Sequence, residues 1–292
     1  MEDRLSQLPD EVIVSILSQL TIREAVQTSS LSTQWHYLWM HVTRLNFDIS
    51  EFITWKICHY PRLCRKEGMK HINLINNVLD FHKGAHLEEF TLSFPFHKHF
   101  KRVIRWKSDL FLENVTSLLT ADFKMTQAVI CELVHTFTTY FTRLTTLSLE
   151  FCHMGLDLYF LDHALPKFNN LKVLVLKLSG MEDVSLLGIT PLIEASPYLQ
   201  KLHIELEWAK TMISKEKVIQ KKCPHQHLKE VKYSGYLGGF ADRVLTTYLT
   251  RNSVALDTLF IDPYEYDAQE PRVRARRHLQ GKIPKRVKLV IL

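Results

Sequence analysis

The cysteine and histidine residues of this 292-residue chain come nearest to metal or thiol chemistry. Cys223, His225 and His227 place three ligand types in one short stretch. A zinc site takes four ligands, usually from two separated pairs, and no second pair follows. Cys152 and His153 offer a nucleophile and a base, but adjacent residues of a strand point to opposite faces. We therefore expect no metal site, no cofactor and no catalytic residue.

Glycines and basic residues offer two patterns that could bind phosphate. Gly235, Gly238 and Gly239 lack the Lys-Ser/Thr of a phosphate loop and are predicted to form a turn. Basic residues alternate with apolar ones from His97 to Lys107, and four arginines lie between Arg272 and Arg277. Such stretches can contact a phosphate backbone, but they also form the solvated face of a helix. Nucleic acid is therefore the alternative partner and a protein the preferred one.

Composition indicates a folded chain with a mildly basic balance. Hydrophobic residues make up 46%, and 37 Lys and Arg against 31 Asp and Glu give a net charge of +6. Five cysteines without a pairing pattern are typical of reduced thiols. The polar start does not match a secretion signal, and no stretch approaches the roughly 20 apolar residues of a membrane span. We expect an intracellular protein of the cytoplasm or nucleus, with no membrane partner.

The first forty residues predict three short helices. Helical i, i+3, i+4, i+7 spacing is shared by four aliphatic residues: Ile13, Ile16, Leu17 and Leu20. Thr21 and Glu24 form a capping box at the start of a second helix, and a third follows around residues 31–40. So few residues cannot bury this apolar surface alone, so we expect part of the stripe to dock on another protein.

Four segments then carry a family resemblance: Leu5-Ser6-x-Leu8-Pro9-Asp10-Glu11-Val12-Ile13, Ile16-Leu17-Ser18-x-Leu20, Glu24-Ala25-Val26-x-Thr28-Ser29-x-Leu31-Ser32 and Trp35-x-x-Leu38-Trp39. Together they resemble an F-box, and more narrowly that of the large plant family with leucine-rich repeats and an FBD-type C-terminal region. The resemblance implies docking on a Skp-family adaptor and, through it, on a cullin. Gln34 departs from the family's usual Arg or Lys, and we expect a modest loss of affinity from this.

The resemblance and the helical spacing together assign eleven residues to adaptor binding: Leu5, Leu8, Pro9, Val12, Ile13, Ile16, Leu17, Leu20, Val26, Trp35 and Leu38.

The rest of the chain repeats an apolar-x-x-apolar-x-apolar pattern. Its first positions are Val42, Leu87, Val115, Leu144, Leu171, Leu199, Leu228, Leu256 and Val287. From residue 87 the steps are 28, 29, 27, 28, 29, 28 and 31 residues, at the upper end of the leucine-rich-repeat range. Each unit predicts a short strand and a return segment that must stack on its neighbours. Helical return segments are expected at 123–141, 186–193 and 244–249.

The C-terminal third also resembles the FBD-type region, in Cys223-Pro224-His225-x-His227-Leu228, in residues 255–263 and in Arg274-Ala275-Arg276-Arg277. The expected fold class is α/β: a three-helix F-box followed by an irregular leucine-rich-repeat solenoid with a parallel β-sheet. The predicted domains are an F-box at 1–41, a connector and capping repeat at 42–85, leucine-rich repeats at 86–222 and FBD-like repeats at 223–292.

The function that the resemblance implies is substrate recognition in an SCF-type (Skp-cullin-F-box) ubiquitin ligase. The chain itself would not be an enzyme, and its client would be a protein whose identity the sequence does not reveal. The alternative is a basic solenoid that binds nucleic acid or another anionic surface.

Overall fold

The computed structural model describes residues 7–48, 61–84, 86–93, 118–126, 143–154, 165, 167–180, 186–208, 224–264 and 270–292. The chain forms two compact units, residues 1–124 and 125–292. Five of the predictions above fall on residues that the structure does not describe: the adaptor-binding role of Leu5, the basic stretch at 97–107, the repeat position Val115, Cys223, and most of the helix expected at 123–141.

The first unit begins with short helices and continues into parallel strands. Its elements are α1 (Asp10–Leu17), α2 (Ile22–Gln27), η1 (Thr28–Ser30), α3 (Trp35–Leu38), η2 (Trp39–His41), β1 (Arg44–Asp48), α5 (Pro61–Phe81), β2 (Glu89–Ser93) and β3 (Thr120–Thr126). The strands pair in chain order, with Leu45 beside Phe90 and Phe90 beside Ala121. α5 turns the buried Ile72, Ile75 and Leu79 inward, at helical spacing.

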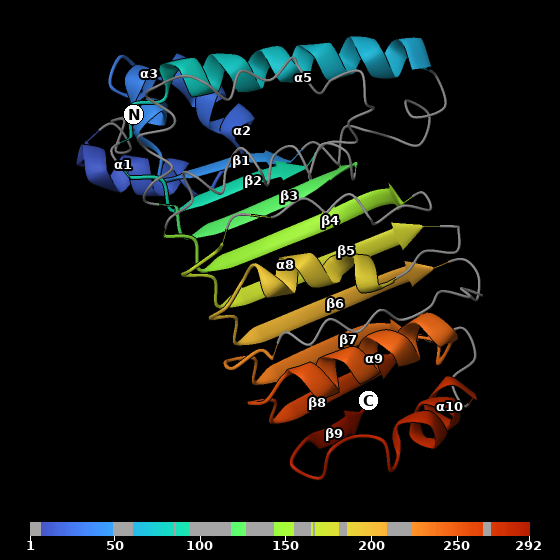
Figure 1. Cartoon of the computed structure of the whole chain (residues 1–292). Helices are drawn as coiled ribbons and strands as arrows, with labels where there is room; N and C mark the ends of the chain where they lie inside the picture. The colour runs from blue at the N-terminus through green and yellow to red at the C-terminus, as the bar shows by residue number, and fades with distance from the viewer. Residues whose placement is uncertain are drawn as a thin grey trace. The chain divides into compact units, whose positions relative to one another are not determined.

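The second unit repeats the same strand-and-return arrangement. Its elements are β4 (Thr146–Met154), β5 (Val173–Gly180), η5 (Leu186–Ile189), α8 (Thr190–Glu194), β6 (Lys201–Trp208), β7 (Glu230–Tyr236), α9 (Phe240–Asn252), β8 (Thr258–Pro263), α10 (Glu270–Leu279) and β9 (Lys288–Ile291). Each strand from β4 to β8 pairs in parallel with the next along the chain. Helices α8 and α9 cover one face of these strands (Figure 1).

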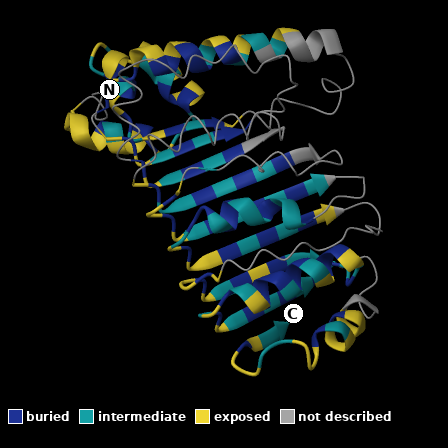
Figure 2. Cartoon of the chain, viewed as in Figure 1, coloured by how far each residue is buried: buried dark blue, intermediate teal, exposed yellow. Residues whose placement is uncertain are grey.

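The predicted repeat pattern matches the register of the second unit. Its two strand positions form ladders of side chains at most 2% exposed: Leu147, Leu174, Leu202, Val231 and Leu259 in one, and Leu149, Leu176, Ile204, Tyr233 and Ile261 in the other. Alternate strand residues face solvent, so each strand is buried on one face only (Figure 2). The expected helical returns are confirmed as η5 with α8, and as α9.

Two repeats were predicted in the wrong frame. Leu259 pairs with Leu289 and Ile261 with Ile291, whereas the pattern predicted Val290 and Leu292. In the first unit, Leu92 pairs with Phe123, which makes Leu118 rather than Val115 the first position of that repeat. Sequence spacing counts loop and strand residues alike, so a loop that changes length shifts the apparent frame.

Two further local predictions need correction. Phe123 lies in β3, so the helix expected from residue 123 begins with a strand instead. Gly235 lies in β7 at an irregularity between Ser234 and Tyr236, and only Gly238 and Gly239 form the turn before α9. Strands and turns both use glycine, so the residue type alone did not separate the two.

The predicted fold class, an N-terminal helical F-box followed by a leucine-rich-repeat solenoid with a parallel sheet, is confirmed. None of the described helices is both long and apolar enough to span a bilayer. The finer domain limits at 41, 85 and 222 remain predictions.

Candidate functional site

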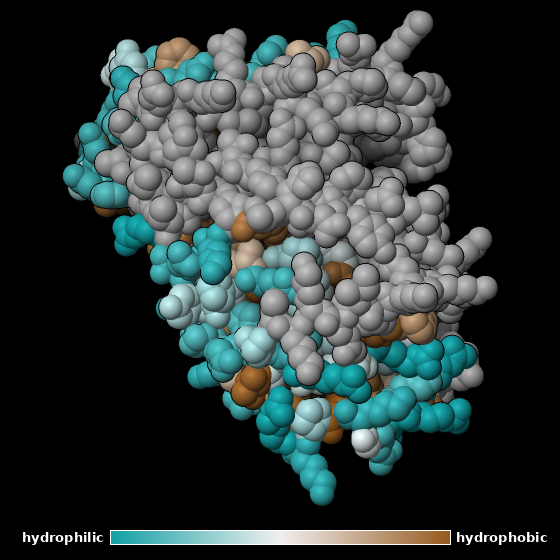
Figure 3. Space-filling view, in the orientation of Figure 1, coloured by the Kyte–Doolittle hydropathy of each residue, from teal (hydrophilic) through white to brown (hydrophobic). Residues whose placement is uncertain are grey.

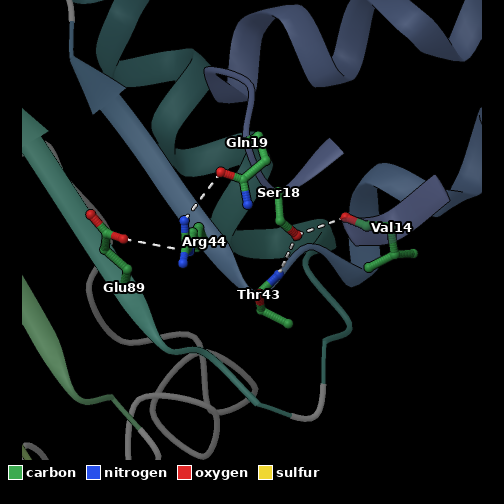
Figure 4. Close-up of polar contacts among 6 residues, drawn as sticks. All are labelled: Val14, Ser18, Gln19, Thr43, Arg44 and Glu89. Atoms are coloured by element: carbon green, nitrogen blue, oxygen red, sulfur yellow. Dashed lines mark hydrogen bonds and ion pairs between the residues drawn. The ribbon is translucent and has the colours of Figure 1, made fainter. Parts of the chain in front are cut away.

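The N-terminal residues of α1 suit a helix start, and hydrogen bonds at its C-terminal end link it to the first strand. Pro9 precedes the helix, and Asp10 and Glu11 in the first turn suit the positive end of the helix dipole. At the other end, the Ser18 hydroxyl donates to the Val14 carbonyl at 2.7 Å and accepts from the Thr43 amide at 3.1 Å (Figure 4). Because Thr43 directly precedes β1, this contact ties α1 to the first strand.

Arg44 adds a second link between this end of α1 and the strands. Its guanidinium donates to the Gln19 side-chain oxygen at 3.3 Å and lies 3.5 Å from the Glu89 carboxylate of β2 (Figure 4). Both partners of the ion pair are 43% exposed, so we expect its contribution to stability to be small.

The predicted capping box starts α2. The Glu24 amide donates to the Thr21 hydroxyl oxygen, and the Thr21 amide donates to the Glu24 carboxylate at 2.9 Å. Hydrogen bonds from Thr21 lower the pKa of the Glu24 carboxyl, which stays on the surface. The box stops α2 from extending back toward α1 and keeps the two helices separate.

The structure divides the predicted apolar stripe between the core and the surface. Ile13 and Leu17 are fully buried, so they pack inside the first unit. Val12 and Ile16, one turn apart on α1, are 43% and 40% exposed. Pro9 is exposed on the same side, three residues before Val12. The outward-facing row of α1 is therefore Pro9, Val12 and Ile16.

The other predicted adaptor-binding residues also separate by burial. Trp35 and Leu38 lie in the core at 4% and 9% exposure, so they pack beneath the exposed residues of the domain. Leu8, Leu20 and Val26 are half-buried. Ile13, Leu17, Trp35 and Leu38 are buried in the structure, and the adaptor-binding role of the eleven residues stays a prediction.

Two large exposed side chains were not among the predicted site residues. Leu31 is 64% and Tyr37 60% exposed, on the irregular segment that carries η1, α3 and η2. Short 3₁₀ turns around a four-residue helix do not keep a 3.6-residue period, so sequence spacing could not show which way these side chains point.

Gln34 brings this segment beside the start of α1. Its side-chain amide donates to the Leu8 carbonyl at 3.3 Å and to the Asp10 carboxylate at 2.8 Å. The residue that departs from the family pattern thus keeps a structural role as a neutral donor. We name the exposed residues Pro9, Val12, Ile16, Leu31 and Tyr37 together the F-box surface.

The histidines considered as metal ligands use their ring nitrogens for other contacts. The Nε2 atom of buried His225 lies 2.7 Å from the Ser196 carbonyl, and its Nδ1 accepts from the Leu228 amide. His227 bonds the Pro197 carbonyl through Nδ1, and Cys223 lies outside the described residues. Among the described residues no cluster of three or more His, Cys, Asp or Glu could hold a metal.

A cavity of about 230 Å³ lies beside His225 in the second unit. Its wall includes Tyr248, whose hydroxyl donates to the Glu194 carboxylate at 3.0 Å. The volume is below the roughly 300–1,000 Å³ typical of small-molecule sites. The F-box surface therefore remains the stronger candidate for a functional site.

Comparison with known proteins finds an F-box domain in this part of the chain. Residues 5–46 match the F-box domain. An Arabidopsis thaliana protein named Putative F-box protein At3g58860 is 26% identical over 275 residues, which cover 92% of this chain and 52% of the relative. Another, Putative F-box protein At1g67390, is 30% identical over 235 residues, or 77% of this chain and 46% of the relative.

Relatives with repeat names also match. The Arabidopsis F-box/FBD/LRR-repeat protein At5g53840 is 56% identical over 50 residues, 17% of this chain and 11% of the relative. The chain spans about half the length, or less, of the curated relatives it matches. The chain thus carries an F-box domain, and with its parallel sheet of repeats it is similar to Arabidopsis proteins named F-box/LRR-repeat and F-box/FBD/LRR-repeat proteins.

Proposed function

We propose that this chain is the client-recognition subunit of an SCF-type ubiquitin ligase. Its F-box surface docks on a Skp-family adaptor held by a cullin, and its repeats hold a protein client. The observation that carries the proposal is the exposure of Val12, Ile16, Leu31 and Tyr37, between 40% and 64%, within a matched F-box domain. Large apolar side chains gathered on helices of one small domain are typical of a surface covered by another protein.

No single side chain of the F-box surface can supply the binding free energy, so several must contribute. Full burial of a large apolar side chain is worth about 1.5–3 kcal/mol, and these four residues are already about half covered. Each therefore adds about 1 kcal/mol, against association costs of about 4–15 kcal/mol. Half-buried Leu8, Leu20 and Val26 must contribute too. A charge placed within the surface is therefore a sharper test than a truncation to alanine.

In this role the chain performs no chemistry of its own. It raises the effective concentration of client lysines near a ubiquitin-charged enzyme, which needs two binding surfaces and no catalytic residue. The place of action is the cytoplasm, the nucleus or both. These statements rest on the F-box match and on the family resemblance.

The alternative, a basic solenoid that binds nucleic acid, has little support from the open face of the sheet in the second unit. The solvent-facing positions of β4 to β9 carry four lysines and five carboxylates. Two of these lysines lie near carboxylates, Lys177 at 3.8 Å from Glu205 and Lys201 at 3.6 Å from Glu230. A face with nearly balanced charge does not attract a phosphate backbone.

Substitution of Ile16 by aspartate tests the proposal. Ile16 is 40% exposed, so Ile16→Asp leaves the core intact and places a charge in the F-box surface. We expect a plant Skp-family adaptor to co-purify with the intact chain and to be lost from the variant. The matched control is Val254→Asp, at an exposed valine of the second unit, which should retain the adaptor.

Adaptor binding that survives Ile16→Asp would refute the role of the surface, and loss in both variants would indicate a general effect of the added charge. The interaction should also persist at several hundred millimolar salt, because it is mainly apolar. A steep fall of the affinity with salt would instead favour the phosphate-binding alternative.

A further inference from the structure

The positive charge of the chain is concentrated in its last described segment. Residues 270–292 contain eight Lys and Arg and one Glu, a net charge of +7. The whole chain carries +6, so the remaining 269 residues together are close to neutral. The net positive charge of the chain is therefore matched by that of residues 270–292, which hold α10, the turn after it and β9.

Helix α10 directs this charge outward. Ala275 and Leu279, one turn apart, are 0% and 4% exposed and pack inward, and α10 contacts β8 and β9. The exposed side is rich in basic residues and is hydrophilic at the lower right of Figure 3. We name this exposed set the basic patch: Arg272, Arg274, Arg276, Arg277 and Lys282.

Helix stability does not explain the basic patch. Positive charge suits the last turn of a helix, which accounts for Arg276 and Arg277, but it is unfavourable in the first turn, where Arg272 lies. Arg272 and Arg276 are also like charges at i, i+4 spacing, which repel. Within the described part of the chain, no carboxylate forms an ion pair with Arg272, Arg276, Arg277 or Lys282.

Partial burial and the positive charges around the basic patch together lower the pKa of the neighbouring His278. The pKa of His278 is lowered, first by partial burial and then by the positive charges of Arg243, Lys282, Arg277 and Arg274. Charges from α9, α10 and the following turn therefore act on one point, as expected for a continuous surface. Arg286 lies outside it, because its guanidinium donates to the carbonyls of Thr250 and Ser253 at the end of α9.

We infer that the basic patch binds an acidic segment of a protein. Several guanidinium groups on one helix face can form paired hydrogen bonds with carboxylates, and exposed Val273 (54%) offers an apolar contact among them. Residues 270–292 contain no Phe, Tyr or Trp on which a nucleic-acid base could stack. That this segment belongs to a client of the ligase rests on the proposed function.

The test uses the intact chain and a fluorescent glutamate-rich peptide, with two competitors: the same peptide with glutamine for glutamate, and a single-stranded DNA of matched charge. Fluorescence anisotropy should show binding of the acidic peptide. The triple variant Arg272→Gln, Arg276→Gln, Arg277→Gln should weaken it about tenfold or more, as expected for three exposed charge pairs. The control Lys167→Gln, Lys172→Gln, Lys229→Gln removes equal charge from exposed sites elsewhere and should change affinity less than about twofold.

Three results would overturn the inference: no binding of the acidic peptide, equal losses in both triple variants, or tighter binding of the DNA than of the peptide. Adaptor co-purification from the same preparations separates this inference from the proposed function. An adaptor that binds while the peptide does not refutes the basic patch alone. A peptide that binds while the adaptor does not refutes the ligase role and leaves the acidic-segment site in place.

Discussion

Two buried histidines make equivalent contacts in the two units. His82 lies 1% exposed with its Nε2 atom 2.9 Å from the Val42 carbonyl, and His225 reaches the Ser196 carbonyl in the same way. Each histidine precedes a strand and holds the backbone that precedes the neighbouring strand. Burial lowers the pKa of both imidazoles, which therefore act as neutral donors between successive repeats.

The first prediction concerns acid sensitivity at His82. The pKa of His82 is lower in the folded chain than its unfolded value near 6.5. The unfolded chain therefore binds more protons than the folded chain as the pH falls, so the free energy of unfolding decreases below about pH 6.5. His82→Gln keeps a donor for Val42 but cannot titrate. We expect the free energy of unfolding, measured with denaturant at pH 7.5 and 5.5, to fall less between the two in this variant than in the original chain. The two falls should differ by at most about 1.4 kcal/mol per pH unit.

The exposed His86 provides the control, as His86→Gln. An acid loss equally reduced by both substitutions, or unchanged by His82→Gln, would contradict the role assigned to His82. The sequence could not predict this contact, because a histidine in a polar stretch before a strand looks the same whether it is buried or solvated.

At the scale of elements, a buried carboxylate sets the start of α9. The Asp242 carboxylate accepts from the Gly239 amide at 2.9 Å, from the Leu237 amide at 3.1 Å and from the Tyr233 hydroxyl. Burial raises the pKa of the Asp242 carboxyl. Burial of the Tyr233 hydroxyl, together with the nearby Asp242 carboxylate, raises the pKa of Tyr233. The network joins β7 to the helix that covers it.

The second prediction ranks two substitutions in this network. Asp242→Ala leaves two backbone amides and a hydroxyl without an acceptor, so it should lower the free energy of unfolding by about 2–4 kcal/mol. Tyr233→Phe removes one donor and should cost about 1 kcal/mol. Exposed Asp257→Ala serves as the control in denaturant unfolding. Equal effects of the three substitutions would show that the network does not stabilise the fold.

The third prediction compares two glycines with similar left-handed backbone. Gly235 has φ +80°, and a Cβ there would lie 2.1 Å from the Leu206 carbonyl oxygen of β6. Gly281 has φ +78° with nothing within 4 Å. Gly281→Ala should therefore cost about 1 kcal/mol of unfolding free energy, from backbone strain alone. Gly235→Ala should cost at least about 3 kcal/mol, and equal costs would contradict the close approach of β7 to β6.

Sequence predicted elements well where one period dominated. Leucines such as Leu147, Leu174 and Leu202 fell into register because each strand must bury one face against the helices. The last repeat was misplaced by one residue, because Val290 and Leu289 are equally apolar and only strand pairing separates them. Leu31 and Tyr37 were not predicted as site residues, because their segment has no regular helical period.

At the scale of the whole molecule, the two proposed binding surfaces lie in different units. The F-box surface is in the first unit, and the basic patch is in the second. Helical spacing identified Ile16, and the family resemblance added Pro9 and Val12, but neither separated exposed Ile16 from buried Leu17. That division depends on contacts with elements distant in sequence, such as the bond between Ser18 and Thr43.

The fourth prediction follows from this separation. Between about 0.1 and 0.5 M salt, the affinity for the adaptor should change less than about threefold, because apolar contacts are not screened. The affinity for an acidic peptide should fall by about tenfold or more over the same range. Two titrations on one preparation check this. Parallel salt dependence of both affinities would show that the two surfaces do not differ as described.

The central claim is that a second polypeptide covers the F-box surface, and side-chain footprinting by hydroxyl radicals measures this directly. The intact chain is labelled alone and in complex with a plant Skp-family adaptor. The account predicts that adaptor binding protects Pro9, Val12, Ile16, Leu31 and Tyr37, while Val254 and Val273 keep their reactivity. A complex that forms without protecting α1, or that protects only the second unit, would contradict it.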